Sequence, residues 1–395
     1  MVSEFDKNLN ISYVDESLPT PPVKLALKHC LCSYLIYFVI YVILVANPFF
    51  SKFFINEFRR WYIIAYVLYL FAAPIIYLVF RPKSLYTSHN IDIFDYFVGL
   101  FKLIFNKETL INKDCKAVLQ GFLPTYRQKQ ALMLMFIKVF YGTMMTSFLY
   151  SDIRHAIADS KISAPILYNI FSDFTFVNFK NIIISNADFI YNSILNLLFL
   201  VDVAYFSIGY VTEAAFLNNK IRTVDTNIFG VLVCVACYTP FSYATISFLG
   251  WNQNDNMMLF NDYSSAFGWA LRFIALFFLT IYVSASVSLG TRASNLTNRG
   301  TVSRFPYNIV RHPAYACKNL FWFFSVLPLL IVHFSYIKAN FVPYVTKSAL
   351  IICSLLFWLF LYYLRAVTEE RHLMQDPEYQ EYAKKVKWRF IPYVF

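Results

Sequence analysis

Eight apolar segments dominate the sequence and constrain its fold more than any other feature. Each is close to the roughly 20 residues that an α-helix needs to cross the hydrocarbon core of a bilayer. They cover residues 29–46, 61–80, 131–150, 189–210, 228–249, 266–289, 319–336 and 345–364. A β-strand crosses a membrane in about half that length, so segments of this size favour helices. The fold predicted is all-α: a polytopic membrane protein with about eight transmembrane helices.

The composition supports a membrane protein over a soluble one. Hydrophobic residues make up 58% of the 395 positions and charged residues only 14%, whereas soluble domains have roughly a quarter charged residues. The apolar residues are strongly aromatic, with 43 Phe and 30 Tyr, which suits lipid-facing and interfacial positions. Only 9 Gly are present, and no glycine-rich turn of a soluble nucleotide-binding domain is found among them.

The distribution of Lys and Arg predicts the orientation in the membrane. The N-terminal tail and every second connection after it carry 23 of these residues, whereas the opposite set of connections carries 8. Because cytosolic loops are enriched in positive charge, both termini are expected in the cytosol. The net charge of +11 then reflects attraction to anionic lipid, and no nucleic-acid partner is needed to explain it.

Three regions are predicted along the chain. Residues 1–26 are polar and proline-bearing and are expected to form a short flexible cytosolic tail. Residues 27–225 form an N-terminal membrane region of four helices with no assigned role. Residues 226–395 form the C-terminal core. The stretch 94–105 is too short to span a bilayer and is expected to be an interfacial helix.

Three charged residues lie inside predicted spans: Lys138, Asp202 and Arg272. Lys138 and Asp202 are expected at similar depth, so we predict that they pair, as a structural contact between helices rather than a substrate site. Arg272 is nearer the opposite face and could extend to the interface. Cys234 and Cys237 form a CxxC within an apolar span, which we interpret as helix packing and not as a metal or redox site.

Two polar stretches in the last quarter differ from the rest of the chain. The first covers residues 295–315 and the second residues 365–395. The charge distribution places both on the cytosolic side, at opposite ends of the helical hairpin formed by the last two spans. We therefore expect the two stretches to meet, at a position where a water-soluble cofactor could reach a membrane-embedded substrate. This is the predicted cytosolic C-terminal cofactor pocket.

Two prolines in these stretches indicate helix starts. Pro313 can occupy the first turn of a helix, which would place Arg311 and His312 at its N-terminus, where free N–H groups and the helix dipole favour anions. Asp376 followed by Pro377 predicts a short helix near the C-terminus.

The second stretch also contains a compact set of charged and aromatic residues. Arg365 and Glu369 are four residues apart and can pair on one helix face. Glu370 is about 100° around the helix from Glu369 and has no obvious partner. Tyr379 and Tyr382 are expected on one side of the short helix.

The order of these motifs resembles the isoprenylcysteine carboxyl methyltransferase family and related membrane and phospholipid methyltransferases. The shared order is Pro-Tyr-x3-Arg-His-Pro-x-Tyr, a hydrophobic hairpin, Arg-x3-Glu-Glu-x2-Leu, then Tyr-x2-Tyr and a terminal Ile-Pro. The resemblance covers about residues 290–395. It implies that this region holds S-adenosylmethionine without a Rossmann fold and transfers its methyl group to a membrane-embedded lipid or lipidated substrate.

The resemblance also implies roles for individual residues. His312 and Tyr315 would contact the cofactor, Arg311 would shape its pocket, and Glu369 or Glu370 would complete it. The full predicted cofactor-binding set is Tyr307, Arg311, His312, Tyr315, Arg365, Glu369 and Glu370, with Leu373, Tyr382 and Pro392 in the pocket wall. Phe305 and Cys317 stand where the family usually has glycine.

Two alternative functions stay open. Membrane sterol reductases that use NADPH end in a run similar to residues 388–392, but the acidic residue usual after their Arg-His is missing here. A transporter or binding protein is compatible with eight spans, although no inverted repeat is visible. The acceptor of the methyl group could be a carboxylate, a phosphate or an amine. A composition rich in Phe, Ile, Asn and Lys favours a bacterial inner membrane over the endoplasmic reticulum.

Overall fold

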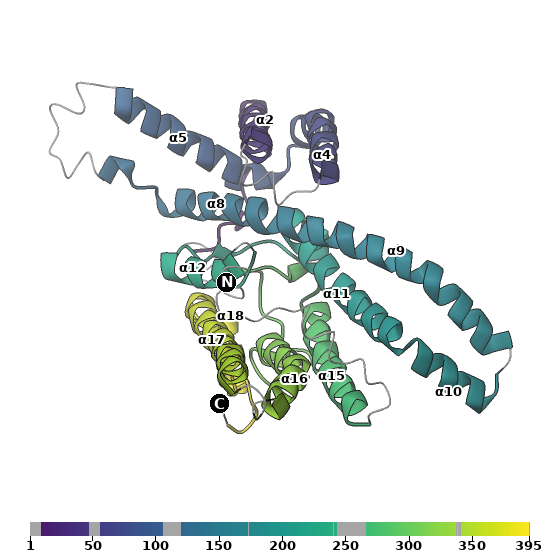
Figure 1. Cartoon of the computed structure of the whole chain (residues 1–395). Helices are drawn as coiled ribbons and strands as arrows, with labels where there is room; N and C mark the ends of the chain where they lie inside the picture. Colours follow the sequence, from purple (N-terminus) through teal and green to yellow (C-terminus); the bar gives the residue numbers. More distant parts are fainter. Residues whose placement is uncertain are drawn as a thin grey trace. The chain divides into compact units, whose positions relative to one another are not determined.

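Helices make up nearly all of the regular structure (Figure 1). The computed structural model describes residues 9–46, 56–105, 120–172, 174–239, 241–242, 266–336, 338 and 341–394. The α-helices are α2 (Val23–Ala46), α4 (Asn56–Pro74), α5 (His89–Phe105), α8 (Tyr126–Ile137), α9 (Thr143–Ser172), α10 (Phe176–Ser185), α11 (Ala187–Val211), α12 (Ile228–Ala236), α15 (Ala266–Leu289), α16 (Pro313–Tyr336), α17 (Phe341–Leu373) and α18 (Pro377–Lys385).

Short turns and one pair of strands complete the described part of the chain. The π-helical turns are η1 (Ile75–Val79) and η3 (Lys138–Gly142), and the 3-10 turns are η2 (Lys83–Thr87), η4 (Ala215–Leu217) and η5 (Gly290–Arg292). Strands β1 (Thr223–Val224) and β2 (Thr297–Asn298) pair antiparallel, with Thr223 opposite Asn298.

Seven helical stretches in the described residues are long and apolar enough to cross a membrane. They are Val23–Leu44, Tyr62–Val79, Tyr126–Ser172, Ala187–Val211, Phe267–Arg292, Pro313–Tyr336 and Phe341–Leu373. Seven of the eight predicted spans coincide with them. The other, 228–249, begins as α12 and extends beyond residue 242, outside the described residues. These helices are consistent with an all-α polytopic membrane protein.

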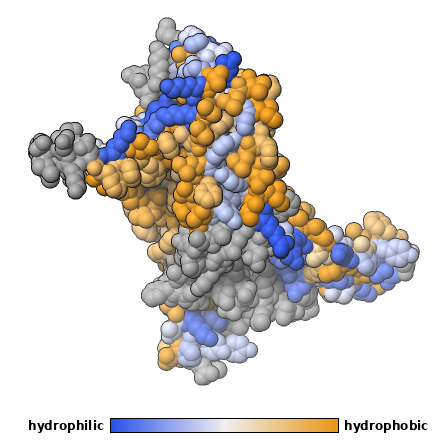
Figure 2. Space-filling view, turned by 90° about the horizontal axis from the view of Figure 1, so that it is seen from above, coloured by the Kyte–Doolittle hydropathy of each residue, from blue (hydrophilic) through white to orange (hydrophobic). Residues whose placement is uncertain are grey.

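Apolar side chains cover much of the surface of these helices. In Figure 2 hydrophobic residues form broad continuous areas, whereas hydrophilic residues form narrower patches between them. Phe71 on α4 is 73% exposed and Phe360 on α17 is 55% exposed. Soluble proteins rarely expose contiguous apolar areas of this kind, so this surface is suited to lipid.

The residues between the predicted spans 131–150 and 189–210 are mostly helical. Helix α9 continues to Ser172, and α10 follows after Thr175, whose side chain caps it by accepting from the Asn178 N–H. The polar residues after residue 150 end the apolar run but not the helix, since a helix satisfies its own backbone whatever its side chains. The predicted helix over 94–105 is longer than expected and begins at His89 as α5.

The described residues separate into two compact units. Unit 1 contains Met1–Ser147, Tyr210–Thr226 and Asn295–Arg299, and unit 2 contains Phe148–Gly209, Asn227–Ser294 and Gly300–Phe395. Helices α2, α4, α5 and α8 belong to unit 1, where Ile36, Ile93 and Ala131 are among the buried residues of one core cluster. Each unit is described separately below.

Two residues of the stretch predicted as a flexible tail, Ile11 and Ser12, make contacts within unit 1. Ile11 is 4% exposed, and its N–H donates to the carbonyl of Arg222 at 2.8 Å. Ser12 donates to the carbonyl of Ile221 and to Glu213. The polar composition indicated exposure here, but these contacts bury the side chain of Ile11.

Lys138 and Asp202, which the sequence predicts to pair, each have a different partner within their own unit. In unit 1 the Lys138 ammonium lies 3.3 Å from a carboxylate oxygen of Glu213. In unit 2 Asp202 accepts a hydrogen bond from Tyr282 at 2.6 Å and another from Ser286. Depth along a helix was estimated from the sequence, but depth does not determine which face a side chain is on.

Two core clusters in unit 2 hold its helices together. One packs α12 against α16 and α17 and includes Val233, Val326 and Trp358. The other packs α11 against α15 and α16, where Arg272 is 1% exposed and lies near the rings of Trp269 and Tyr191. Arg272 is therefore buried between helices of unit 2, and its extension to the membrane interface stays a prediction. Together the clusters fix the start of α16 and the end of α17.

Candidate functional site

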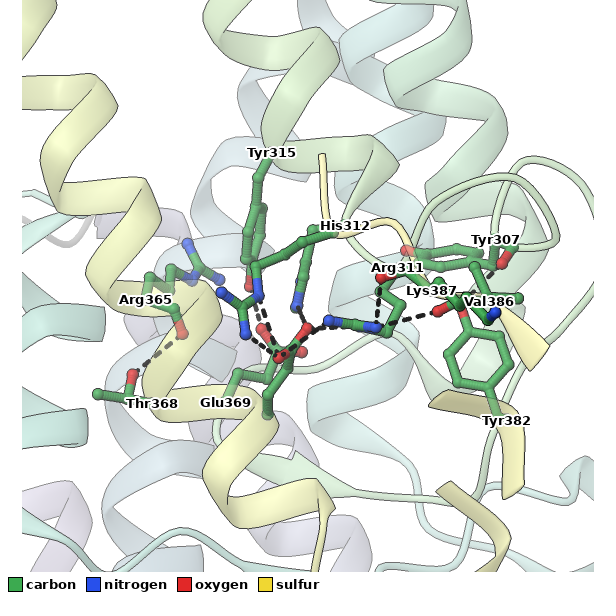
Figure 3. Close-up of polar contacts among 12 residues, drawn as sticks. Tyr307, Arg311, His312, Tyr315, Arg365, Thr368, Glu369, Tyr382, Val386 and Lys387 are labelled. Atoms are coloured by element: carbon green, nitrogen blue, oxygen red, sulfur yellow. Dashed lines mark hydrogen bonds and ion pairs between the residues drawn. The ribbon is translucent and has the colours of Figure 1, made fainter. Parts of the chain in front are cut away.

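The start of α16 and the end of α17 meet in unit 2, as the sequence predicts for the two polar stretches (Figure 3). Helix α16 begins at Pro313, the residue expected to open it. The backbone N–H groups of Arg311 and His312 donate to the carbonyls of Trp388 and Arg389, each at 2.9 Å. The C-terminal segment is therefore hydrogen-bonded directly to the start of α16.

Glu370 is the centre of a buried ion cluster, which contradicts the expectation that it has no partner. One oxygen accepts from Arg311 Nε at 2.7 Å and from His312 Nε2 at 3.1 Å. The other accepts from Arg389 Nη2 at 2.7 Å, from Arg389 Nε at 3.1 Å and from Arg311 Nη2 at 3.5 Å. Because an ionised carboxylate only accepts, His312 carries its proton on Nε2.

This cluster leaves Glu370 without capacity for a ligand. A carboxylate has about four lone-pair sites, and five N–H contacts already reach Glu370. Its side chain is 6% exposed. Hydrogen bonding to Glu370 also raises the pKa of the Arg389 guanidinium. Glu370 therefore holds three basic side chains in place, and of the two adjacent carboxylates Glu369 has the fewer donors among the described residues.

Glu369 faces the aromatic side of the site. The Tyr315 hydroxyl donates to one of its oxygens, and no other described residue donates to it. The rings of His312 and Tyr315 are stacked, with centroids 5.2 Å apart and planes 13° from parallel. In Figure 3 both rings are seen above Glu369. An acceptor-only carboxylate with unused lone pairs next to flat aromatic faces is suited to a cation.

Arg365 lies within a group of tyrosine rings. Its guanidinium carbon is 4.8 Å from the ring centroid of Tyr315, 5.4 Å from that of Tyr238 and 5.8 Å from that of Tyr362. It also donates to the Tyr238 hydroxyl at 3.4 Å. The side chain is buried. The predicted pair between Arg365 and Glu369 stays a prediction, since the contacts above involve only aromatic residues.

A third part of the site is the aromatic cluster of α18. Asp376 caps this helix by accepting from the Glu378 N–H at 3.0 Å, which confirms the predicted start at Pro377. Tyr379 and Tyr382 are buried on one side of α18, also as predicted, and pack near Tyr307. The Tyr382 hydroxyl donates to the Tyr307 carbonyl at 2.7 Å. Burial raises the pKa of all three tyrosines, so their hydroxyls are neutral at physiological pH.

The predicted residues are therefore brought together in two groups. Arg311, His312 and Glu370 form the ion cluster, while Tyr315, Arg365 and Glu369 form the aromatic side. Tyr307 lies with the α18 cluster. Three further residues were missed: Arg389, Tyr238 and Tyr362. Arg389 could have been found from its charge within the terminal motif, whereas Tyr238 belongs to another predicted span and had no signal.

The chemistry of the aromatic side fits the cofactor implied by the resemblance. S-adenosylmethionine carries a carboxylate, an ammonium and a sulfonium cation. Arg365 and the N–H groups of the first turn of α16 are donors suited to a carboxylate. Glu369 is an acceptor suited to an ammonium, and its negative charge also suits a neighbouring sulfonium. The residues present therefore fit the group.

Comparisons with known proteins identify no relative. No family model matches the chain, and no curated protein or solved structure is significantly similar to it. The methyltransferase resemblance therefore stays a prediction that depends on the motifs and on the geometry of the site.

Proposed function

We propose that unit 2 catalyses methyl transfer from S-adenosylmethionine to a membrane-embedded lipid or lipid-linked acceptor. The observation that supports the proposal best is the difference in hydrogen-bond donors between two adjacent carboxylates. Glu370 is fully occupied by Arg311, His312 and Arg389, whereas Glu369 accepts only from Tyr315 among the described residues. Such a pair places an ion-paired carboxylate beside one with acceptor capacity left, which supports binding of a cationic cofactor.

The residues of this site act by placement. When bound, S-adenosylmethionine supplies an electrophilic methyl group that needs no further activation. Arg365 would hold a carboxylate and Glu369 an ammonium, beside the stacked rings of His312 and Tyr315. Holding two reactants in near-attack geometry can lower a barrier by about 7–11 kcal/mol. The buried surroundings of Tyr315 and Arg365 exclude water from the same region.

Direct binding tests this proposal without a known acceptor. The melting temperature of the purified full chain in detergent is measured with S-adenosylmethionine, with its demethylated product, and with NADPH. We expect a rise with the first two and none with NADPH, because ligand binding to the folded state stabilises it. A rise with NADPH alone would favour a reductase, and no rise with any of them would contradict cofactor binding at this site.

The acceptor and the orientation need separate measurements. Membranes incubated with methyl-labelled cofactor are extracted so that lipid and protein are counted separately, and we expect label in a lipid-linked product that is lost with His312→Ala. We further infer from the excess of Lys and Arg in alternate connections that both termini are cytosolic. The composition rich in Phe, Ile, Asn and Lys favours a bacterial inner membrane. Accessibility of a cysteine placed after residue 394 in inside-out and right-side-out vesicles tests that orientation.

A further inference from the structure

A second polar cluster lies deeper in unit 2, where α11, α15 and α16 meet. Asp202 on α11 accepts from the hydroxyls of Tyr282 and Ser286, one turn apart on α15. All three residues are less than 9% exposed. Lys318 on α16 faces this group, with its ammonium 5.3 Å from the centroid of the Tyr282 ring. The mechanism proposed above uses none of these residues.

Lys318 is the member of the cluster with capacity left to bind. Both oxygens of Asp202 already have hydroxyl donors. An ammonium has three N–H donors, yet across the described residues no carboxylate oxygen lies within 4.0 Å of the Lys318 nitrogen, and no hydrogen bond of this side chain is formed. Ionisable residues within a membrane span are rare and are normally paired. A partly buried lysine with this environment is suited to an anion that arrives with a substrate.

The position of Lys318 connects it to the cofactor site. It follows Tyr315 by three residues and therefore lies on nearly the same face of α16, about 4.5 Å further along the axis. From the start of the helix at Pro313, Lys318 is about 7.5 Å into the span, a depth suited to the head group of a lipid whose chains are in the bilayer.

We propose that Lys318 binds the anionic oxygen group of the methyl acceptor, with Asp202, Tyr282 and Ser286 holding the cluster in position. This inference rests on the proposed function and narrows its substrate to a lipid-linked carboxylate or phosphate, excluding an amine. An oxygen lone pair of the acceptor forms the new bond to the methyl carbon, and the methyl–sulfur bond breaks with its electron pair remaining on sulfur. A carboxylate becomes a neutral ester in this step, so the product no longer pairs with Lys318 and its release is favoured.

The experiment uses the full chain in detergent with methyl-labelled cofactor and a total lipid extract. Mild base releases label from a methyl ester as volatile methanol, but leaves methyl phosphate and N-methyl groups intact, and phosphate and amine products are then separated by charge. Three variants are compared with the wild type: Lys318→Met, Lys318→Arg and, as a matched control, Lys347→Met, which removes an exposed lysine of α17.

We expect Lys318→Met to lower kcat/KM for the acceptor about tenfold or more, the effect of losing one charge-assisted contact. Its melting temperature should still rise with the demethylated cofactor, which shows that the fold and cofactor site are intact. Lys318→Arg should retain part of the activity, and Lys347→Met all of it. Label recovered as N-methyl amine, or a Lys318→Met variant as active as the wild type, would overturn the inference. No rise in melting temperature for the wild type would instead contradict the proposed function, and the inference with it.

Discussion

Arg311 Nε lies 2.7 Å from an oxygen of Glu370, and this contact joins the start of α16 to the end of α17. The two residues are 59 positions apart and belong to opposite ends of the last helical hairpin. Since Arg389 binds the other oxygen of Glu370, one carboxylate connects three segments of unit 2. The start of α16, the end of α17 and the C-terminal segment therefore depend on a single side chain for their relative positions.

Replacing Glu370 should consequently lower the stability of the fold, because its carboxylate holds these segments together. Glu370→Gln leaves the positive charges of Arg311 and Arg389 without a counter-charge in a buried setting, where breaking an ion pair costs about 3–5 kcal/mol. We expect a clear fall in melting temperature, together with loss of the rise caused by the demethylated cofactor. Thermal unfolding of the purified variant, with and without that ligand, measures both effects.

The adjacent Glu369 provides the matched control for this prediction. Glu369→Gln removes a charge one residue away, but its only donor in the described part of the chain is the neutral Tyr315 hydroxyl. Its melting temperature without ligand should stay close to that of the wild type, while cofactor affinity falls about tenfold or more. Equal destabilisation by Glu369→Gln and Glu370→Gln would contradict the assignment of a structural role to Glu370 alone.

The ion pair between Lys138 and Glu213 in unit 1 should stabilise the fold more than the exposed pair between Lys28 and Asp95, although the latter is shorter. The Glu213 side chain is only 18% exposed, and the two charges are 3.3 Å apart. Lys28 and Asp95 are closer, at 2.7 Å, but both are more than 40% exposed, and exposed pairs are worth about 0–1 kcal/mol. Double-mutant cycles with Met for Lys and with Gln or Asn for the acids should give a coupling of about 1–2 kcal/mol for Lys138–Glu213 and below about 0.5 kcal/mol for Lys28–Asp95. The reverse order would contradict the roles assigned to burial and distance.

Unit 1 should lose stability as the pH falls from about 6.5 to about 4. Burial lowers the pKa of His89 from 6.5 to about 4, so folded His89 stays neutral in this range while unfolded His89 binds a proton. Unfolding therefore takes up a proton, and stability falls with decreasing pH by up to about 3 kcal/mol. Burial alone would raise the pKa of Glu213, but the charges of Lys138 and His89 outweigh it and the pKa is lowered, which adds a loss in the same direction at still lower pH.

A neutral substitution isolates the His89 contribution. Melting temperatures between pH 7.5 and 4.5 should fall less steeply for His89→Gln than for the wild type. His155→Gln, which changes an exposed histidine of α9, should follow the wild-type curve. Parallel curves for all three proteins would show that the pKa of His89 is not lowered in the folded state.

Gly209 should not tolerate even an alanine. A Cβ atom at this position of α11 would lie 2.0 Å from the carbonyl oxygen of Ala293, a backbone atom that cannot rotate away. Gly209→Ala should therefore destabilise unit 2 by about 1–3 kcal/mol or more. Gly99→Ala in α5, where nothing lies within 4 Å, should be neutral or stabilising by about 0.5–1 kcal/mol. Chemical denaturation of the two variants measures the change in the free energy of unfolding and shows whether each substitution stabilises or destabilises the protein.

The membrane spans and the helix starts could be predicted from the sequence because they depend only on residues close together in the chain. Pro313 and Asp376 each mark the start of the helix they predict, and the spans depend only on length and hydropathy. The meeting of residues 311–312 with residues 369–370 could also be predicted, since two antiparallel spans of similar length return the chain to the same side. The extension of α9 could not, because a polar turn does not by itself end a helix.

Which side chains contact each other between helices could not be predicted in the same way. Lys138 and Asp202 have opposite charges at similar estimated depths, but Glu213 and Tyr282 are the residues that contact them. Rotation of each helix about its axis decides such contacts, and it depends on packing against all neighbours at once. The same applies to Glu370, whose partner Arg389 lies beyond α18, and to Lys318, which the sequence presented only as one more positive charge near the membrane.

The pairing of Thr223 with Asn298 has a consequence for how this protein could be divided or recombined. Unit 1 contains Asn295–Arg299, a five-residue segment with unit 2 on both sides of it in the chain. A gene fragment that ends at residue 225 would encode β1 without its partner strand, and a fragment that starts at residue 226 would carry β2 with nothing to pair with. One recombination point in the gene therefore cannot replace a whole unit by the equivalent unit of another protein, and the two units are inherited together.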